Sequence, residues 1–360
     1  MKAAVCREFK QPLTIENIKL ADPARGEVIV ALKACAICHS DIIYMDGGWG
    51  GPLPAVYGHE ASGIVKQVGE DVEEFAHGDH VVVTLIRSCG NCLPCAKGQQ
   101  VMCDSTFHLD DNQPIKSEDG EVLHQGMRTG AFAEQVLVHQ SQMAKISDDI
   151  AFTSAALLAC GVLTGFGAVT NTAEVPFGSS VVIIGTGGVG LNTVQGAKAV
   201  GANPVIAMDL SDDKLNTALD FGATHAINIT SETAQQQLLD LTSGRGADYV
   251  FITVGAKIAV DQGVNYLAKG GTLVIVGMPG SGVMGSYEIV GLASQSQKII
   301  GSKMGSSRVK NDISVLTDLY QQGRLKLDEL VTDCYPLEQI NDAIDAVRSG
   351  QVIRNVIVFD

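Results

Sequence analysis

The sequence has few aromatic residues and a shortage of positive charge. Phenylalanine, tyrosine and tryptophan make up 5% of its 360 residues, and there is a single tryptophan. Lysine and arginine number 25 against 40 aspartates and glutamates, so the net charge is −15. Because nucleic acids and anionic membrane surfaces attract positive proteins, this balance argues against both as partners.

The amino-terminal segment MKAAVCREFKQ lacks the apolar core of a signal sequence. No stretch is expected to supply the roughly 20 apolar residues of a membrane span. Nine cysteines are an odd number for a set of disulfides, and four of them crowd between residues 89 and 103. We therefore expect a cytoplasmic protein whose cysteines bind metal.

The length of the chain favours two domains. Short β-like runs alternate with turns as far as about residue 160 and predict a mostly-β domain. From Ser180 onward, apolar strands alternate with helical segments, and this pattern predicts consecutive βαβ units. Two probable helices near 311–322 and 337–349 and a last strand in 352–359 are expected to return to the first domain. The polar stretch 104–128 is interpreted as a surface lobe.

The cysteine cluster has the spacing C-x-x-C-x-x-C followed by a fourth cysteine; its members are Cys89, Cys92, Cys95 and Cys103. Four thiolates suit a closed tetrahedral zinc site, which is structural because no position stays open for a substrate. An iron–sulfur cluster and a disulfide pair are the weaker alternatives, since the ferredoxin spacing is absent.

A second set of possible ligands lies in three segments; these are Cys35 with Cys38, His59 with Glu60, and Cys160. Two thiolates and one imidazole can hold zinc while leaving a position open for substrate. Taken alone, these residues also allow a redox C-x-x-C pair, buried apolar cysteines and a core histidine.

A dinucleotide-binding turn follows the strand 180–184; its glycines are Gly185, Gly187, Gly188 and Gly190. The strand–turn–helix context is the one that lets pyrophosphate approach the helix amino terminus. The next strand ends at Asp209, whose carboxylate can accept hydrogen bonds from the adenine ribose and repel a 2′-phosphate. The motif thus predicts NAD in preference to NADP, against the alternative that Asp209 caps a helix.

Together these motifs resemble the zinc-containing medium-chain dehydrogenase/reductase family, specifically its alcohol dehydrogenase branch. The resemblance implies an α/β protein in which a GroES-like mostly-β catalytic domain, residues 1–161 and 304–360, surrounds a doubly wound Rossmann domain, residues 162–303. It also implies a structural zinc lobe at about 88–104, two zinc ions per chain, NAD as cofactor, and a small-molecule alcohol, aldehyde or ketone as substrate.

The resemblance also implies roles for single residues. The catalytic zinc ligands would be Cys38, His59 and Cys160, with Glu60 as an alternate ligand. Asp41 would orient His59, and Ser40 would take the alcohol proton. The implied cofactor contacts are His39 and Arg354 at the pyrophosphate, Lys214 at the adenine ribose, and Thr164 and Val189 at the nicotinamide.

Ile43 departs from the family pattern, because many relatives have a proton-relaying histidine there. The substrate pocket is expected to include Trp49, Leu85 and Met278. A glutathione-dependent formaldehyde dehydrogenase is the closest rival, but Trp49 and Phe107 replace its glutathione-binding residues. A non-catalytic NAD-binding protein on the same fold is a further alternative. We also expect a homodimer or homotetramer, formed through an edge strand at 298–300.

Overall fold

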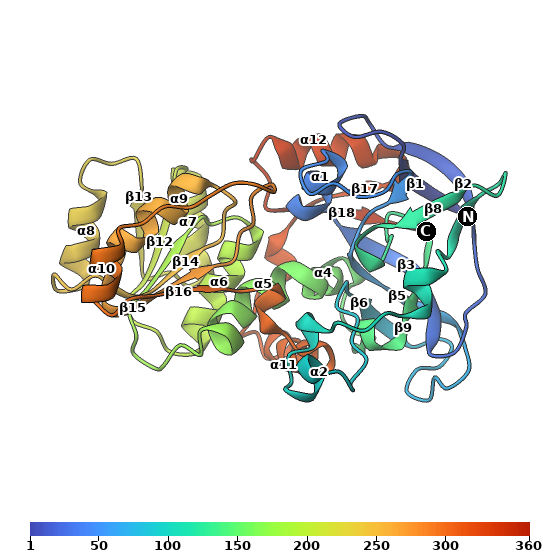
Figure 1. Cartoon of the computed structure of the whole chain (residues 1–360), viewed down its shortest axis with the longest axis horizontal. Coiled ribbons are helices and arrows are strands. Elements are labelled where there is room, and N and C mark those ends of the chain that lie inside the picture. Colours follow the sequence, from blue (N-terminus) through green and yellow to red (C-terminus); the bar gives the residue numbers. More distant parts are fainter. The chain divides into compact units, whose positions relative to one another are not determined.

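The computed structural model describes every residue from Met1 to Asp360 and divides the chain into two compact units. Unit 1 comprises Met1–Gly161 and Arg308–Asp360, and both chain ends lie in it (Figure 1). Unit 2 is Val162–Ser307. It ends later than the expected residue 303, since the Ser307 hydroxyl donates a hydrogen bond to the Leu163 carbonyl within this unit.

A small closed barrel forms one part of unit 1. Its strands, in order around the barrel, are β1 (Lys2–Cys6), β2 (Thr14–Leu20), β7 (Ile115–Ser117), β8 (Val122–Gln125) and β4 (Ala55–Val56). Two of these strands, β7 and β8, fall in the stretch 104–128, so part of the stretch interpreted as a surface lobe belongs to the barrel. Ile115 is buried beside the exposed Lys116, and Leu123 is buried beside the exposed Val122, so one face of each short strand is directed to the core.

A seven-stranded sheet forms the other part of unit 1. Its path runs β10 (Met143–Lys145), β6 (His80–Val83), β5 (Glu60–Val68), β3 (Glu27–Ala36), β18 (Arg354–Val358) and β17 (Val331–Pro336), and β9 (Gln135–His139) also pairs with β3. β3 is the central strand, because it pairs with β5, β9 and β18. The predicted final strand, 352–359, is therefore part of the first domain.

Unit 1 also contains six α-helices. They are α1 (His39–Met45), α2 (Leu93–Ala96), α3 (His108–Asp111), α4 (Phe152–Leu157), α11 (Val309–Gln321) and α12 (Ile340–Arg348). In α12, Ile340, Ala343, Ile344 and Val347 are buried, which is the i, i+3, i+4, i+7 pattern of a helix with one apolar face. That face contacts β18.

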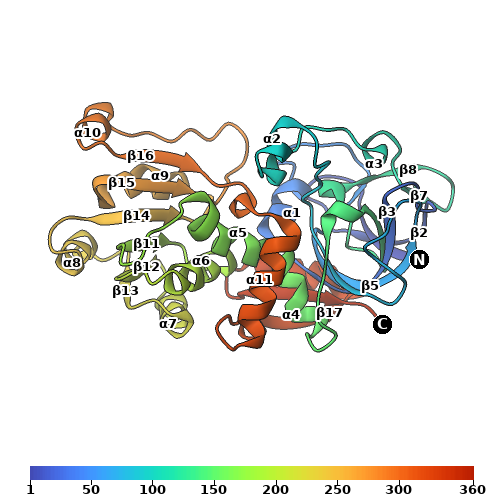
Figure 2. The same cartoon turned by 90° about the horizontal axis from the view of Figure 1, so that it is seen from below.

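Unit 2 is built on a six-stranded parallel sheet. Its strands in spatial order are β13 (His225–Asn228), β12 (Val205–Asp209), β11 (Val181–Ile184), β14 (Ala247–Ile252), β15 (Leu267–Ile275) and β16 (Lys298–Gly301), and Figure 2 shows this order. Counted along the chain the order is 3-2-1-4-5-6, which confirms the predicted doubly wound sheet. The order reverses between β11 and β14, where such sheets bind ligands.

One helix of unit 2 precedes β11, and five helices connect its successive strands. They are α5 (Leu163–Gly167), α6 (Gly188–Ala199), α7 (Asp212–Phe221), α8 (Ala234–Leu241), α9 (Lys257–Gly263) and α10 (Ile289–Ser294). All four residues of β11 are apolar and buried, as expected for a parallel strand that is covered on both faces.

One helical run corrects the expectation that no segment is long and apolar enough for a membrane span. Phe152–Thr172 is long and apolar enough to cross a membrane by composition, with a mean hydropathy of 1.8 over its best window. Of that window, 89% is buried inside the protein, as in a core helix. The run includes two π-helical turns, Leu158–Val162 and Ala168–Thr172.

Candidate active site and metal centres

The register of the seven-stranded sheet brings three distant segments together. Ala36, at the end of β3, pairs with Glu60 of β5 on one side and with Val356 of β18 on the other. Cys38 lies two residues after the end of β3 and directly before the first residue of α1. As a result the segments with Cys38, His59 and Arg354 meet at one end of the sheet.

Four possible metal ligands gather there. Cys38, His59, Glu60 and Cys160 are all buried, and their ligand atoms all lie within 4.8 Å of one another. Cys160 lies in the π-helical turn Leu158–Val162, and α4, which leads into that turn, contacts β3 and β5. Irregular π turns inside helices are frequent at functional sites.

Asp41 connects two of these residues. Its Oδ1 lies 3.0 Å from His59 Nδ1 and accepts a hydrogen bond from the Gly58 backbone at 2.9 Å. Its Oδ2 accepts a bond from the Cys38 backbone at 3.0 Å. Because Asp41 is fully buried, one carboxylate fixes both the imidazole ring and the start of α1.

Gly58 is required for this arrangement. Its φ is +91°, in the left-handed region, and a Cβ there would lie 2.6 Å from the Phe132 backbone nitrogen. Only glycine therefore allows the chain to present His59 at this point.

The chemistry of these side chains suits zinc. His59 Nε2 is buried and has no hydrogen-bond partner, while its Nδ1 is held by Asp41. A hydrogen bond with Cys160 lowers the pKa of Cys38 well below its usual value, and the same contact raises the pKa of Cys160. Two sulfurs and a free imidazole nitrogen are the donor set of an open zinc site.

The redox alternative for Cys35 and Cys38 finds no support in the structure. Burial raises the pKa of Cys35 well above its usual value, which disfavours the thiolate that a redox pair uses. Its Sγ contacts the Ala36 carbonyl at 3.8 Å, and Cys35 does not belong to the group of possible ligands. Cys35 thus resembles a small apolar core residue.

A buried ion pair borders the ligand group. Arg354 Nη2 donates a hydrogen bond to Glu60 Oε1, while Glu60 Oε2 accepts one at 3.2 Å from the Gly161 backbone. Burial raises the pKa of Glu60 to about 7, and the nearby guanidinium opposes that rise. This pair was not foreseen from the sequence, where Arg354 was assigned to the cofactor pyrophosphate.

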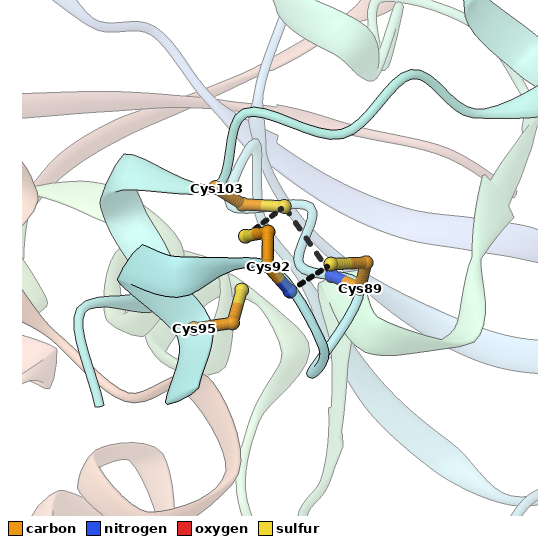
Figure 3. A group of neighbouring side chains, drawn as sticks. All are labelled: Cys89, Cys92, Cys95 and Cys103. Carbon is orange, nitrogen blue, oxygen red and sulfur yellow. Dashed lines mark hydrogen bonds between the residues drawn. The ribbon is translucent and has the colours of Figure 1, made fainter. Parts of the chain in front are cut away.

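The four-cysteine group forms in unit 1 as its spacing suggested. Figure 3 shows the sulfurs of all four cysteines turned toward a common centre, and these atoms lie within 4.8 Å of one another. The Sγ atoms of Cys92 and Cys103 are 3.8 Å apart. A disulfide would need ~2.05 Å, whereas zinc with four sulfurs at ~2.3 Å separates neighbouring sulfurs by about 3.8 Å.

Cys89 receives three hydrogen bonds at its sulfur. The Ser105 hydroxyl donates at 3.0 Å, and the backbone nitrogens of Cys92 and Asn91 donate at 3.2 and 3.3 Å. These bonds, with that of Ser105 the largest cause, lower the pKa of Cys89 to about 6. Ser105 was missed in the sequence because nothing in the cysteine spacing marks it.

In unit 2, the glycine-rich turn joins β11 to α6, with Gly187 directly before the helix. A Cβ at Gly190 would lie 1.9 Å from the Gly185 carbonyl oxygen, so this glycine permits the turn itself. A Cβ at Gly187 would meet nothing within 4 Å. The helix amino terminus thus opens onto free space that a pyrophosphate could fill.

Asp209 ends β12 beside this turn. Its Oδ2 accepts hydrogen bonds from the backbone nitrogen of Thr186 at 2.7 Å and from the Thr186 hydroxyl at 3.1 Å. The cap of α7 is instead Ser211, whose hydroxyl accepts a bond from the Lys214 backbone. The helix-cap alternative for Asp209 is therefore wrong.

The remaining predicted site residues lie in helices of the two units. His39 and Ser40 begin α1, and the same helix carries Ile43. In unit 2, Gly188 and Val189 begin α6 and Lys214 lies in α7, while the hydroxyl of Thr164 contacts Met304 Sδ at 3.6 Å. Their assigned roles stay predictions.

Comparison with known proteins identifies two family models and several similar alcohol dehydrogenases. The family model described as alcohol dehydrogenase GroES-like domain matches residues 24–148, and the zinc-binding dehydrogenase model matches residues 188–322. The chain is 37% identical to an NDMA-dependent alcohol dehydrogenase of Amycolatopsis methanolica over 99% of this chain and 98% of that protein. It is 36% identical to a class-3 alcohol dehydrogenase of Pisum sativum over 99% and 97%.

Among solved structures, benzyl alcohol dehydrogenase of Acinetobacter calcoaceticus is similar over the whole chain. The TM-score is 0.93 at 31% identity, covering 100% of this chain and 99% of that one.

Proposed function

Since this chain belongs to the zinc-containing medium-chain dehydrogenase/reductase family, in its alcohol dehydrogenase branch, and is thus an oxidoreductase acting on alcohols, we propose that it holds two zinc ions and uses NAD. The ion at Cys38, His59 and Cys160 would be catalytic, and the ion at the four cysteines structural. The observation that carries this proposal is the buried ligand group with an unpartnered His59 Nε2.

In the proposed reaction the alcohol carbon gives a hydride to nicotinamide C4 and its hydroxyl gives a proton to the protein, which yields an aldehyde or ketone and NADH. When bound, zinc supplies a Lewis acid that lowers the pKa of the alcohol hydroxyl. Ser40 accepts the proton, and Asp41 keeps His59 in the orientation needed for ligation. With Ile43 in the relay position, the proton leaves through ribose hydroxyls and water.

We propose that NAD is preferred because the Asp209 carboxylate lies beside the glycine-rich turn, where a 2′-phosphate would meet a negative charge. The test is NADH absorbance with a panel of primary and secondary alcohols, before and after chelation. Turnover that needs no metal, or equal kcat/KM with NADP, would contradict the proposal. Absence of turnover with every alcohol would favour the non-catalytic NAD-binding alternative.

The glutathione-dependent alternative is disfavoured by the placement of two aromatic residues. Trp49 packs edge-on against Tyr44 with ring centroids 5.0 Å apart. Phe107 packs against His139 at 4.9 Å and lies under the Arg87 guanidinium at 5.5 Å. Neither offers a charge to glutathione. Efficient oxidation of S-hydroxymethylglutathione would reverse this judgement.

We also propose a homo-oligomer formed through unit 2. β16 is an edge strand, and apolar side chains in the segment that joins β15 to β16 are exposed, including Met284 at 75% and Ile289 at 76%. An exposed edge with apolar neighbours favours pairing with a second copy. Light scattering that finds only monomer at micromolar concentration would contradict this. The nine free cysteines are consistent with a reducing compartment, and we propose the cytoplasm.

A further inference from the structure

The carboxylate of Asp209 already accepts four hydrogen bonds. Besides the two from Thr186 to Oδ2, Oδ1 accepts bonds from the backbone nitrogens of Leu210 at 2.8 Å and Ser211 at 3.2 Å. A carboxylate offers about four lone-pair positions. The group that should receive the ribose hydroxyls therefore has no free acceptor position in the protein alone.

The four donors are not equivalent. Three are backbone N–H groups, fixed by the turn after β11 and by the end of β12. The fourth is the Thr186 hydroxyl, which can turn away by rotation about a single side-chain bond. It also makes one of the two longer bonds, 3.1 Å against 2.7 Å for the Thr186 backbone nitrogen. It is thus the donor that a ribose hydroxyl can displace at the lowest cost.

We propose that Thr186 is a positioning residue that sets the strength and selectivity of NAD binding by occupying the acceptor position on Asp209 that a ribose hydroxyl takes in the complex. This inference rests on the proposed use of NAD. Thr186 is 1% exposed, so its displaced hydroxyl cannot turn to bulk water. Binding of NAD in the wild-type protein therefore includes the loss of a buried hydrogen bond.

Replacing Thr186 with valine removes this competition while keeping the shape of the side chain. The three backbone donors remain and still hold the carboxylate. We expect Thr186→Val to bind NAD about three- to tenfold more tightly, the range of a typical net hydrogen bond. NADP should gain less, because its 2′-phosphate has no proton to donate to Asp209. Thr186→Ser keeps the hydroxyl and should behave as the wild type.

The experiment is calorimetric titration of the zinc-loaded protein with NAD and, separately, with NADP. Thr193→Val is the matched control, because Thr193 is equally buried in unit 2 and its hydroxyl donates to the Val189 carbonyl at 3.0 Å, away from Asp209. The control should leave the ratio of the two dissociation constants unchanged.

Tighter NAD binding by Thr186→Val, with an increased preference over NADP and no such change in Thr186→Ser, would support the inference. Unchanged or weaker NAD binding in Thr186→Val, or an equal shift for both dinucleotides, would overturn it. The proposed NAD preference fails separately if the wild-type protein binds NADP as tightly as NAD.

Discussion

Replacement of Asp41 by asparagine tests how the catalytic zinc ligands are held. The three hydrogen bonds that the fully buried carboxylate accepts come from the backbone nitrogens of Cys38 and Gly58 and from the His59 ring. Asparagine keeps the shape but exchanges one acceptor oxygen for an NH₂ group. Whichever way the amide is turned, at least one buried N–H then faces another donor.

An unsatisfied buried donor costs about 1–3 kcal/mol, so the free energy of unfolding of Asp41→Asn should fall by roughly that amount. Loss of the partner that orients a metal-bound histidine typically weakens metal binding ~10- to 100-fold. We therefore expect a chelator to remove one zinc ion per chain from the variant far more readily than from the wild type. The zinc ion at the four cysteines should stay.

Asp46→Asn is the matched control. Asp46 lies at the other end of α1, where it forms an exposed ion pair with Arg348 at 2.7 Å. Such a pair contributes about 0–1 kcal/mol, and no zinc ligand depends on it. The reasoning is refuted if Asp41→Asn retains both zinc ions with wild-type affinity, or if it loses both ions equally.

Two further predictions concern the other sites. Ser105→Ala should raise the pKa of Cys89 from about 6, so that protons compete with zinc for this sulfur at a higher pH. When the protein is acidified in the presence of a chelator, the variant should therefore release the structural zinc at a higher pH than the wild type or Ser105→Thr. An unchanged midpoint pH of zinc release would contradict this. Gly187→Ala should weaken NAD binding with little change in Tm because its Cβ enters open space, whereas Gly190→Ala should lower Tm because its Cβ meets the Gly185 carbonyl. The same loss of Tm in both variants would show that the turn was misinterpreted.

Local motifs made much of the fold and site predictable. Ligand spacing identified the four cysteines, and the strand–turn–helix context located the glycine-rich turn. The two-domain organisation was predictable because short strands separated by turns give way, along the sequence, to consecutive βαβ units. In each case the signal lies within a few neighbouring residues.

Contacts between distant residues were not predictable. The pair between Glu60 and Arg354 joins residues that only the strand register brings together, and the Ser105 hydroxyl lies outside the cysteine spacing. The two strands between residues 115 and 125 could not be predicted from the sequence because each contains few apolar residues. The helical run Phe152–Thr172 was missed because its serines, threonines and glycines interrupt a segment that is apolar on average.

The central claim, two zinc ions with separate roles, is tested most directly by measuring zinc per chain and NADH formation together in the wild type and in Cys160→Ser. We predict two zinc ions and alcohol oxidation in the wild type. In Cys160→Ser we predict a folded protein that keeps the zinc at the four cysteines and has no turnover. A wild-type protein that is fully active with one zinc ion per chain, or a Cys160→Ser variant that keeps both zinc and activity, would contradict the claim.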